Sequence, residues 1–132
     1  MDAKWLIEHE RIRKINGSFS WIDHRFISGR FIHDLSREEI LLYLFLVAVS
    51  DRQGLSFYHD DRICSLLKLD LTALGEAREL LIERALIAWR PPVYQVLSLP
   101  PQPVSPPSPE ERLHRQRQTS LAYLKKIQEV IA

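Results

Sequence analysis

The sequence predicts a mainly α-helical fold with a small β-hairpin, because three kinds of pattern follow one another between residues 35 and 99. A long apolar run comes first, and two shorter segments with the spacing of amphipathic helices come next. Two strand-like runs around a double proline end the series. The expected elements are a helix from Ser36 to the turn at 51–54, helices over about 61–67 and 71–84, and a hairpin over 89–97. The order is therefore a helix, a helix-turn-helix pair and a hairpin.

The first helix begins with a capping box, in which Ser36 and Glu39 satisfy each other's backbone donors. Its body, residues 40–49, is apolar on every face, and such a helix must be covered on every face. A three-helix core covers only part of it, so the N-terminal segment, the C-terminal helix or a second subunit must cover the rest. A homodimer follows from this argument. Replacing Leu44 by Asp is expected to unfold the domain, because an unpaired buried charge costs several kcal/mol.

Turn and cap residues mark the ends of the shorter elements. Gly54 makes a turn, and residues 55–58 form a short strand that could add to the hairpin. The expected helix caps are His59 or Asp60 for the second helix and Asp70 or Thr72 for the third.

The third helix has a clear inward face at helical spacing, made of Leu74, Ala77, Leu81 and Ala85. Gly75 interrupts this helix at a cost of about 1 kcal/mol relative to Ala. We therefore expect Gly75 to permit close packing or the close approach of a partner backbone.

Residues 1–17 are expected to form an N-terminal helix, which Asp2 caps and Gly17 ends. Residues 18–35 are rich in aromatic side chains, so part of this arm must pair as a strand or pack on the core as a short helix. The hypothetical dimer interface consists of Trp5, Phe19, Trp21, Phe26, Tyr43 and Val47.

A proline-rich linker at 100–109 separates the domain, residues 18–99, from a C-terminal amphipathic helix over 110–132. Ser108 and Glu111 form a second capping box, with Pro109 at the first helical position. The apolar seam of this helix comprises Leu113, Leu121, Leu124, Ile127 and Ile131. We expect this helix to be offered to a protein partner.

Composition places the chain among ordinary globular proteins. Its 132 residues are 45% hydrophobic and carry a net charge of +1, which weighs against tight non-specific binding to DNA phosphates. The single cysteine, Cys64, is expected to be a buried and inert thiol. No signal peptide begins the chain, and the longest apolar run is far short of the ~20 residues that span a bilayer. These observations predict a cytoplasmic protein that contacts no membrane.

The chain resembles the winged helix-turn-helix superfamily over residues 18–99, with the hairpin as the wing. The resemblance rests on Leu35-Ser36 leading into LLYLFL at 41–46, on DRQGLSFY at 51–58, and on LIERALI at 81–87 with YQVL at 94–97. Within that superfamily it is similar to small bacterial winged-helix proteins of mobile elements and to the N-terminal domains of replication initiators and DnaD-like primosomal proteins. The resemblance implies that the third helix enters the major groove of DNA and that an N-terminal extension mediates self-association.

A DNA interface of this kind has identifiable candidates. The residues expected to face the groove are Thr72, Glu76, Arg78 and Glu79. The expected phosphate contacts are Arg62, Lys68 and Arg90, with Arg112, Arg115 and Arg117 in the basic start of the last helix. Two features depart from the family pattern. Only Arg78 is basic in the groove-facing set, and the turn Arg90-Pro91-Pro92 is too short to reach far along a minor groove.

Other chemistries lack support in the sequence. Three His/Asp pairs, at 23–24, 33–34 and 59–61, fall at expected element boundaries and lack the i, i+4 spacing of a helical metal pair. No glycine-rich phosphate loop and no set of nucleophile, base and orienting residue is recognisable. We therefore expect no enzyme activity, no metal and no cofactor.

Two functions fit this sequence. The first is a DNA-binding or DNA-associated accessory protein in replication, transposition or transcription control, which binds double-stranded DNA. The alternative is a protein-interaction and dimerisation module on the same scaffold, with little or no DNA binding. The resemblance favours the first function, whereas the near-neutral charge and the acidic third helix favour the second.

Overall fold

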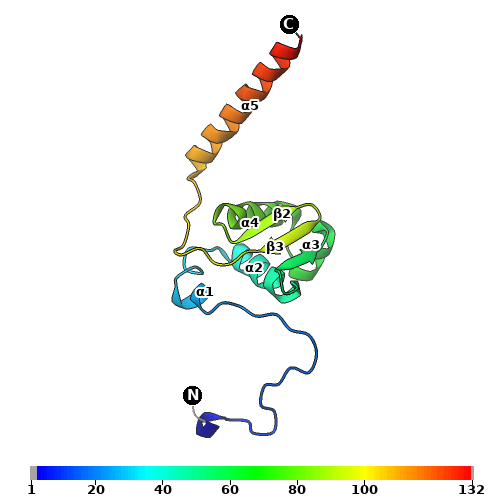
Figure 1. The fold of residues 1–132 in the computed structure, drawn as a ribbon, viewed down its shortest axis with the longest axis vertical. Coiled ribbons are helices and arrows are strands. Elements are labelled where there is room, and N and C mark those ends of the chain that lie inside the picture. The colour runs from blue at the N-terminus through cyan, green and yellow to red at the C-terminus, as the bar shows by residue number, and fades with distance from the viewer. Residues whose placement is uncertain (1–2, 132) are drawn as a thin grey trace.

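The computed structural model describes residues 3–131 and consists mainly of helices, with one small three-stranded sheet. Figure 1 shows a central domain with the N-terminal arm and the last helix extending from opposite ends. The elements are the 3-10 helix η1 (Ala3–Trp5), α1 (Arg25–Ser28), α2 (Arg37–Val49), β1 (Leu55–Phe57), α3 (Asp60–Leu67), α4 (Leu71–Glu83), β2 (Ile87–Arg90), β3 (Val93–Val96) and α5 (Pro109–Ile131).

The sheet has the strand order β1-β3-β2, and both pairs of strands are antiparallel. The short strand expected after Gly54 therefore does add to the hairpin: Ser56 lies opposite Tyr94, which lies opposite Trp89 in β2. Gly54 has φ +84°, and a Cβ at this position would lie 2.3 Å from the carbonyl oxygen of Val96. Only glycine combines this backbone conformation with so close an approach. A two-residue turn, Pro91-Pro92 with a cis peptide bond, joins β2 to β3.

The core lies between α2, α4 and the inner face of the sheet. Leu42 and Leu46 of α2 and Leu74 and Leu81 of α4 are fully buried, as is Tyr94 of β3. The expected inward face of α4 is thus confirmed at Leu74, Ala77 and Leu81, whereas Ala85 lies beyond the helix with φ +60°. Cys64 is half-buried and packs against this core.

Local capping chemistry starts the helices as expected, with one exception. Both capping boxes form: Ser36 with Glu39 at α2, and Ser108 with Glu111 at α5. Asp70 caps α4 by accepting a hydrogen bond from the backbone N–H of Ala73 at 2.7 Å. His59 occupies the cap position of α3, but its side chain makes no capping bond.

Within residues 3–131 the chain does not cover α2 on every face, so neither the arm nor the C-terminal helix supplies the expected cover, and cover by a second subunit stays a prediction. Its outer side presents Leu41 and Leu44, which are 40% and 43% exposed, together with Ala48. The core, which includes Phe26 and Phe31 of the arm, covers the other faces, and at the end of the helix Ser20 Oγ donates hydrogen bonds to the carbonyl oxygens of Ala48 and Ser50. An aspartate at position 44 would therefore stay in contact with water, and the unfolding expected of it does not follow. We call Leu41, Leu44 and Ala48 the open face of α2.

The expected N-terminal helix over 1–17 is also wrong. Within residues 3–17 only η1 is helical, and the chain then continues without regular structure to α1. The expected cap, Asp2, lies outside the described residues. A helix of this length is marginal in water unless a surface supports its apolar face, and Trp5, Ile12 and Ile15 find no such surface here. The local sequence pattern of residues 3–17 is therefore not enough to form a helix.

The arm does contribute to the core beyond residue 22. Phe26 on α1 is buried and stacks on Tyr43 of α2, with 4.6 Å between ring centroids, and Phe31 is also buried. The prediction that Phe26, Tyr43 and Val47 belong to a dimer interface is therefore wrong, because these side chains lie inside the domain's own core. The other three, Trp5, Phe19 and Trp21, are exposed.

The remaining segments match their expected boundaries closely. The linker runs from residue 97 to 108 without regular structure, and α5 begins at Pro109. Every side chain of α5 is exposed except that of Arg112, which is half-buried; Ala132 lies outside the described residues. None of the helices within residues 3–131 is long and apolar enough to cross a membrane.

The two sides of α2 differ in their expected effect on stability. Leu46→Ala should lower the free energy of unfolding by about 3 kcal/mol, because the leucine is fully buried and its removal leaves a cavity. Leu44→Ala, the same change two residues away on the open face, should cost less than about 1 kcal/mol. Urea denaturation of the two variants measures both values. The chain itself leaves Leu44 exposed, so a loss at position 44 equal to that at position 46 would show that a second copy covers the open face.

Candidate nucleic-acid interface

In the helix-turn-helix pair, α3 and α4, the outer surface of α4 is acidic. The turn between α3 and α4 is made by Lys68, which caps α3 in the left-handed conformation with φ 58°, and by Leu69, whose N–H donates to the carbonyl oxygen of Cys64. Along α4, Thr72, Glu76 and Glu79 are exposed, as predicted for groove-facing residues. Glu83 continues the same line at the end of the helix and is half-buried. Positions 76, 79 and 83 have i, i+3 and i+7 spacing, so they form one ridge, which we call the acidic ridge.

Arg78 does not belong to this outer surface, which corrects the prediction that it faces a groove. Its side chain is 11% exposed and turns inward toward α3 and the sheet. The guanidinium donates hydrogen bonds to Asp60 Oδ1 at 2.7 Å and to the Tyr94 hydroxyl at 2.9 Å. Its Cζ also lies 3.7 Å from the ring centroid of Trp89, a cation–π contact. Arg78 therefore ties α4 to the start of α3 and to both strands of the hairpin.

The electrostatics of this cluster keep Arg78 charged and Tyr94 neutral. Burial by itself would lower the pKa of Arg78, but the hydrogen bonds to Asp60 and Tyr94 outweigh burial and raise that pKa above its ordinary value. Burial raises the pKa of the Tyr94 phenol, and the hydrogen bond from Arg78 opposes part of that rise. The cluster thus contains one paired cation at neutral pH and offers no free charge to a phosphate.

The remaining predicted phosphate contacts lie on separate elements. Arg62 on α3, Lys68 in the turn and Arg90 at the end of β2 are exposed, and none of them forms an ion pair with an acidic residue among residues 3–131. Arg115 and Arg117 are exposed on α5, away from the helix-turn-helix pair. Arg112 is bound to Glu83 by an ion pair of 2.9 Å. The predicted set is therefore not gathered into one basic surface.

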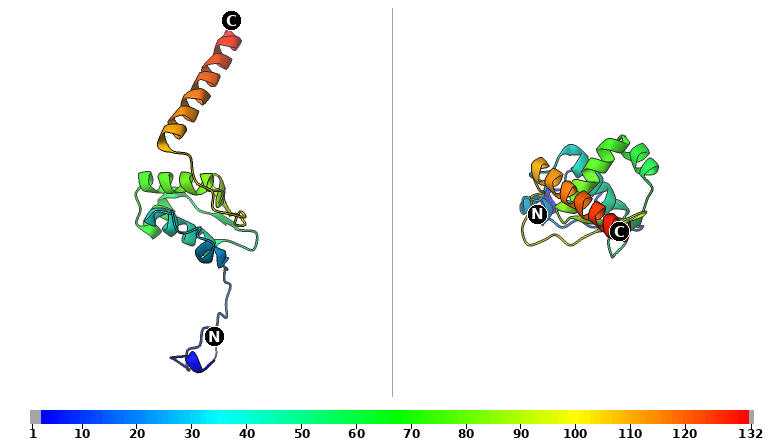
Figure 2. Two further views of the ribbon diagram at one scale, coloured as in Figure 1. Left: turned by 90° about the vertical axis from the view of Figure 1, so that its left-hand side faces the viewer. Right: turned by 90° about the horizontal axis from the view of Figure 1, so that it is seen from above.

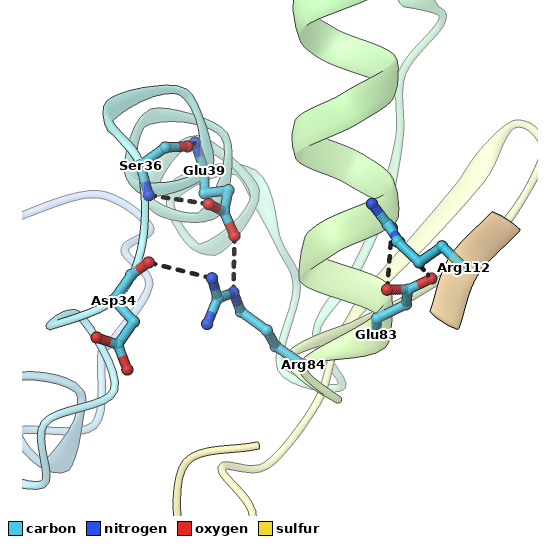
Figure 3. Close-up of polar contacts among 6 residues, drawn as sticks. All are labelled: Asp34, Ser36, Glu39, Glu83, Arg84 and Arg112. Carbon is cyan, nitrogen blue, oxygen red and sulfur yellow. Dashed lines mark hydrogen bonds and ion pairs between the residues drawn. The ribbon is translucent and has the colours of Figure 1, made fainter. Parts of the chain in front are cut away.

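A second buried ion pair was missed by sequence reasoning. Arg84 caps the end of α4 and donates to Glu39 Oε1 at 2.8 Å and to the carbonyl oxygen of Asp34 at 3.1 Å (Figure 3). Glu39 was recognised as part of a capping box, and it does accept the Ser36 N–H at 2.9 Å with its other carboxylate oxygen. No local pattern links residues 39 and 84, so their contact needed the tertiary structure.

Residues 3–131 contain no candidate metal site. Within residues 3–131 no three side chains of His, Cys, Asp or Glu are grouped so that they could hold one ion. Asp60 is instead used by Arg78, and Asp23 accepts the N–H of Arg25 at the start of α1.

Comparison with known proteins yields no relative for this chain: no family model, no curated protein and no solved structure matches it.

Arg78 should behave as a structural residue when it is replaced. Arg78→Ala removes the bonds to Asp60 and Tyr94 and the contact with Trp89, so we expect a loss of about 2 kcal/mol in the free energy of unfolding. Arg62→Ala, which removes an exposed arginine from the neighbouring helix, should leave the denaturation curve unchanged. A stable Arg78→Ala variant would contradict the inward placement of this side chain.

Proposed function

We propose that this chain is a protein-interaction module, built on a winged-helix scaffold, that assembles with a second copy of itself. The observation that carries the proposal is the chemistry of the two outward helix faces. The groove-facing side of α4 is an acidic ridge whose neighbouring arginine is held inside the domain, and the outward side of α2 is apolar. The first surface repels phosphates, and the second is better covered by protein than by water.

The winged-helix part of the proposal is supported by the order of the elements. A helix, a strand, two helices around a tight turn and a hairpin follow one another, and the first strand joins the hairpin on the β3 side. This arrangement is what the resemblance of residues 18–99 implies. It supports a scaffold and does not by itself support a function.

The self-assembly part is supported by the open face of α2 and the arm beside it. Leu41 and Leu44 lie exposed on one side of α2, and Ser20 holds the arm against the end of that helix. The arm also exposes Phe19 and Trp21, which are aromatic residues of the kind enriched in protein interfaces. A second copy that presents the same surface would cover both, as a two-fold interface requires.

Light scattering coupled to size exclusion tests the self-assembly. The wild-type protein should elute with the mass of a dimer, whereas Leu44→Asp should elute as a folded monomer, because a charge at this site opposes burial by a partner. Leu66→Asp places the same charge at an equally exposed leucine on α3 and should leave the dimer intact. A wild-type mass equal to one chain at every concentration would refute the proposal.

A second candidate function is that of a DNA-associated accessory protein. It is favoured by the same element order and by three exposed cations, Arg62, Lys68 and Arg90, on the helix-turn-helix pair and the wing. Such a protein would use these side chains to bind phosphates, with the acidic ridge turned away from the backbone.

A mobility-shift experiment separates the two candidates. Under the proposed function, the protein should not shift a random pool of double-stranded DNA even at low salt. Under the second candidate, binding should weaken steeply with salt, and Arg62→Glu combined with Arg90→Glu should reduce the salt slope by about 2. Arg37→Glu, an exposed arginine at the start of α2, is the matched control for charge reversal. Salt-sensitive binding that only the double variant loses would establish DNA contact.

A further inference from the structure

The last helix has an apolar side that no other part of residues 3–131 covers. Within the 23 residues of α5, seven large apolar or aromatic side chains are exposed: Leu113, Leu121, Tyr123, Leu124, Ile127, Val130 and Ile131. At 100° per residue these positions fall within one half of the helix circumference. In proteins most helical stability comes from packing of an amphipathic face, so α5 should gain stability from a surface that covers its apolar side.

The nearest element on that side of the domain is α4. Figure 1 shows α5 starting beside one end of α4, and Figure 2 shows it rising from the side of the domain that α4 covers. Beside its acidic ridge, α4 has a second line of residues, Leu71, Gly75 and Ile82, of which Leu71 and Ile82 are exposed and Gly75 is half-buried. A Cβ at Gly75 would meet nothing within 4 Å, so the line has a shallow notch in its middle. We call this line the apolar strip of α4.

One contact between the two helices already exists. Arg112, in the first turn of α5, places Nη2 2.9 Å from Oε2 of Glu83 and donates from Nε to Oε1 at 3.3 Å (Figure 3). The Nη2 and Oε2 atoms have no contact with solvent. This ion pair fixes the root of α5 at the end of α4, while the proline-rich linker before it has no regular structure.

We propose that α5 folds back over α4 as an intrachain strap, antiparallel to it, with the Arg112–Glu83 pair as its pivot. The pair sets the register, because each residue forward along α5 then lies opposite one residue backward along α4. Leu113 comes opposite Ile82, Ser120 opposite Gly75 and Leu124 opposite Leu71. Apolar side chains meet apolar side chains at both ends, and a small serine meets the notch at Gly75.

The charges fit this register as well. Arg112 lies at one edge of the α5 apolar side, and Lys125 comes opposite Asp70, the cap of α4. Arg112 thus meets Glu83 at one end of the strap and Lys125 meets Asp70 at the other, whereas Glu79 and Glu76 come opposite the neutral Gln116 and Thr119. Opposite charges at both ends favour this docking geometry over others. Because Gly75 has no side chain, it permits close approach of the strap.

Closing of the strap has a functional consequence that does not depend on the dimer. It covers the apolar strip and the acidic ridge of α4, so these surfaces are open to another molecule only while α5 is lifted. The open face of α2 stays uncovered, because it lies on a different helix and takes no part in the strap.

A disulfide trap tests the strap. In a Cys64→Ser background, Gly75→Cys combined with Ser120→Cys should form an intrachain disulfide under mild oxidation, detected as a faster-moving monomer band on a non-reducing gel. Gly75→Cys with Gln118→Cys is the matched control, since position 118 lies on the opposite side of α5 at nearly the same chain distance. The Ser120 variant should cross-link several-fold more than the control. Equal yields, or cross-links only between chains, would overturn the proposal.

Limited proteolysis gives a second readout that needs no added cysteine. Trypsin cleaves after Arg115, Arg117, Lys125 and Lys126, which the closed strap protects. Gly75→Gln fills the notch and should speed cleavage of α5 several-fold, whereas Ser65→Gln, the same residue placed on the exposed side of α3, should not. Thermal melts of both variants verify that the domain is folded. Unchanged cleavage of Gly75→Gln would contradict the predicted contact.

Discussion

The ion pair between Glu39 and Arg84 is the interaction on which the rest of the domain depends. Both side chains are nearly removed from water, at 2% and 11% exposed, and their charged atoms are 2.8 Å apart. Through them the first turn of α2, the end of α4 and the carbonyl of Asp34 are held at one point. Because Arg84 also precedes the left-handed turn at Ala85, this point sets the direction in which β2 leaves. A buried charge with its partner removed is strongly destabilising, so neither residue is free to vary alone.

Arginine is used in this fold mainly to hold elements together. Arg84 joins α2 to α4, Arg78 joins α4 to α3 and the sheet, and Arg112 joins α5 to α4. Each of these guanidinium groups forms an ion pair with an acidic side chain of the same molecule. The glutamates at 76 and 79 are exposed and take part in none of the ion pairs found within residues 3–131, so the outward charge of α4 is negative. On α4 the arginine is therefore paired inside the domain and the glutamates lie outward, whereas exposed cations such as Arg62 and Arg90 lie on neighbouring elements.

Exposed apolar surface lies on α2 and on both segments that extend from the domain, the arm and α5. The open face of α2 belongs to the central domain, from which the arm extends toward one end of the molecule and α5 toward the other (Figure 1). Exposed apolar area on this scale is unfavourable in water unless a partner or another part of the chain covers it. The proposed dimer covers the first surface, and the proposed strap covers the second. The proposed dimer and the proposed strap use different residues. An experiment that refutes one of them therefore leaves the other untouched.

The sequence by itself determined the features that depend on neighbouring residues. Capping boxes at Ser36 and Ser108, the cap at Asp70 and the glycine turn at 54 are satisfied within a few residues, so their chemistry can be read along the chain. Helical spacing likewise identified the buried face of α4. The tertiary structure alone decided features that depend on distant surfaces. Residues 3–17 stay largely non-helical because no surface supports them, Leu44 stays exposed because the core reaches only the other faces of α2, and Arg78 turns inward because Asp60, Tyr94 and Trp89 meet there. Those three partners lie 11 to 18 positions away in the sequence, where no local pattern records the contact.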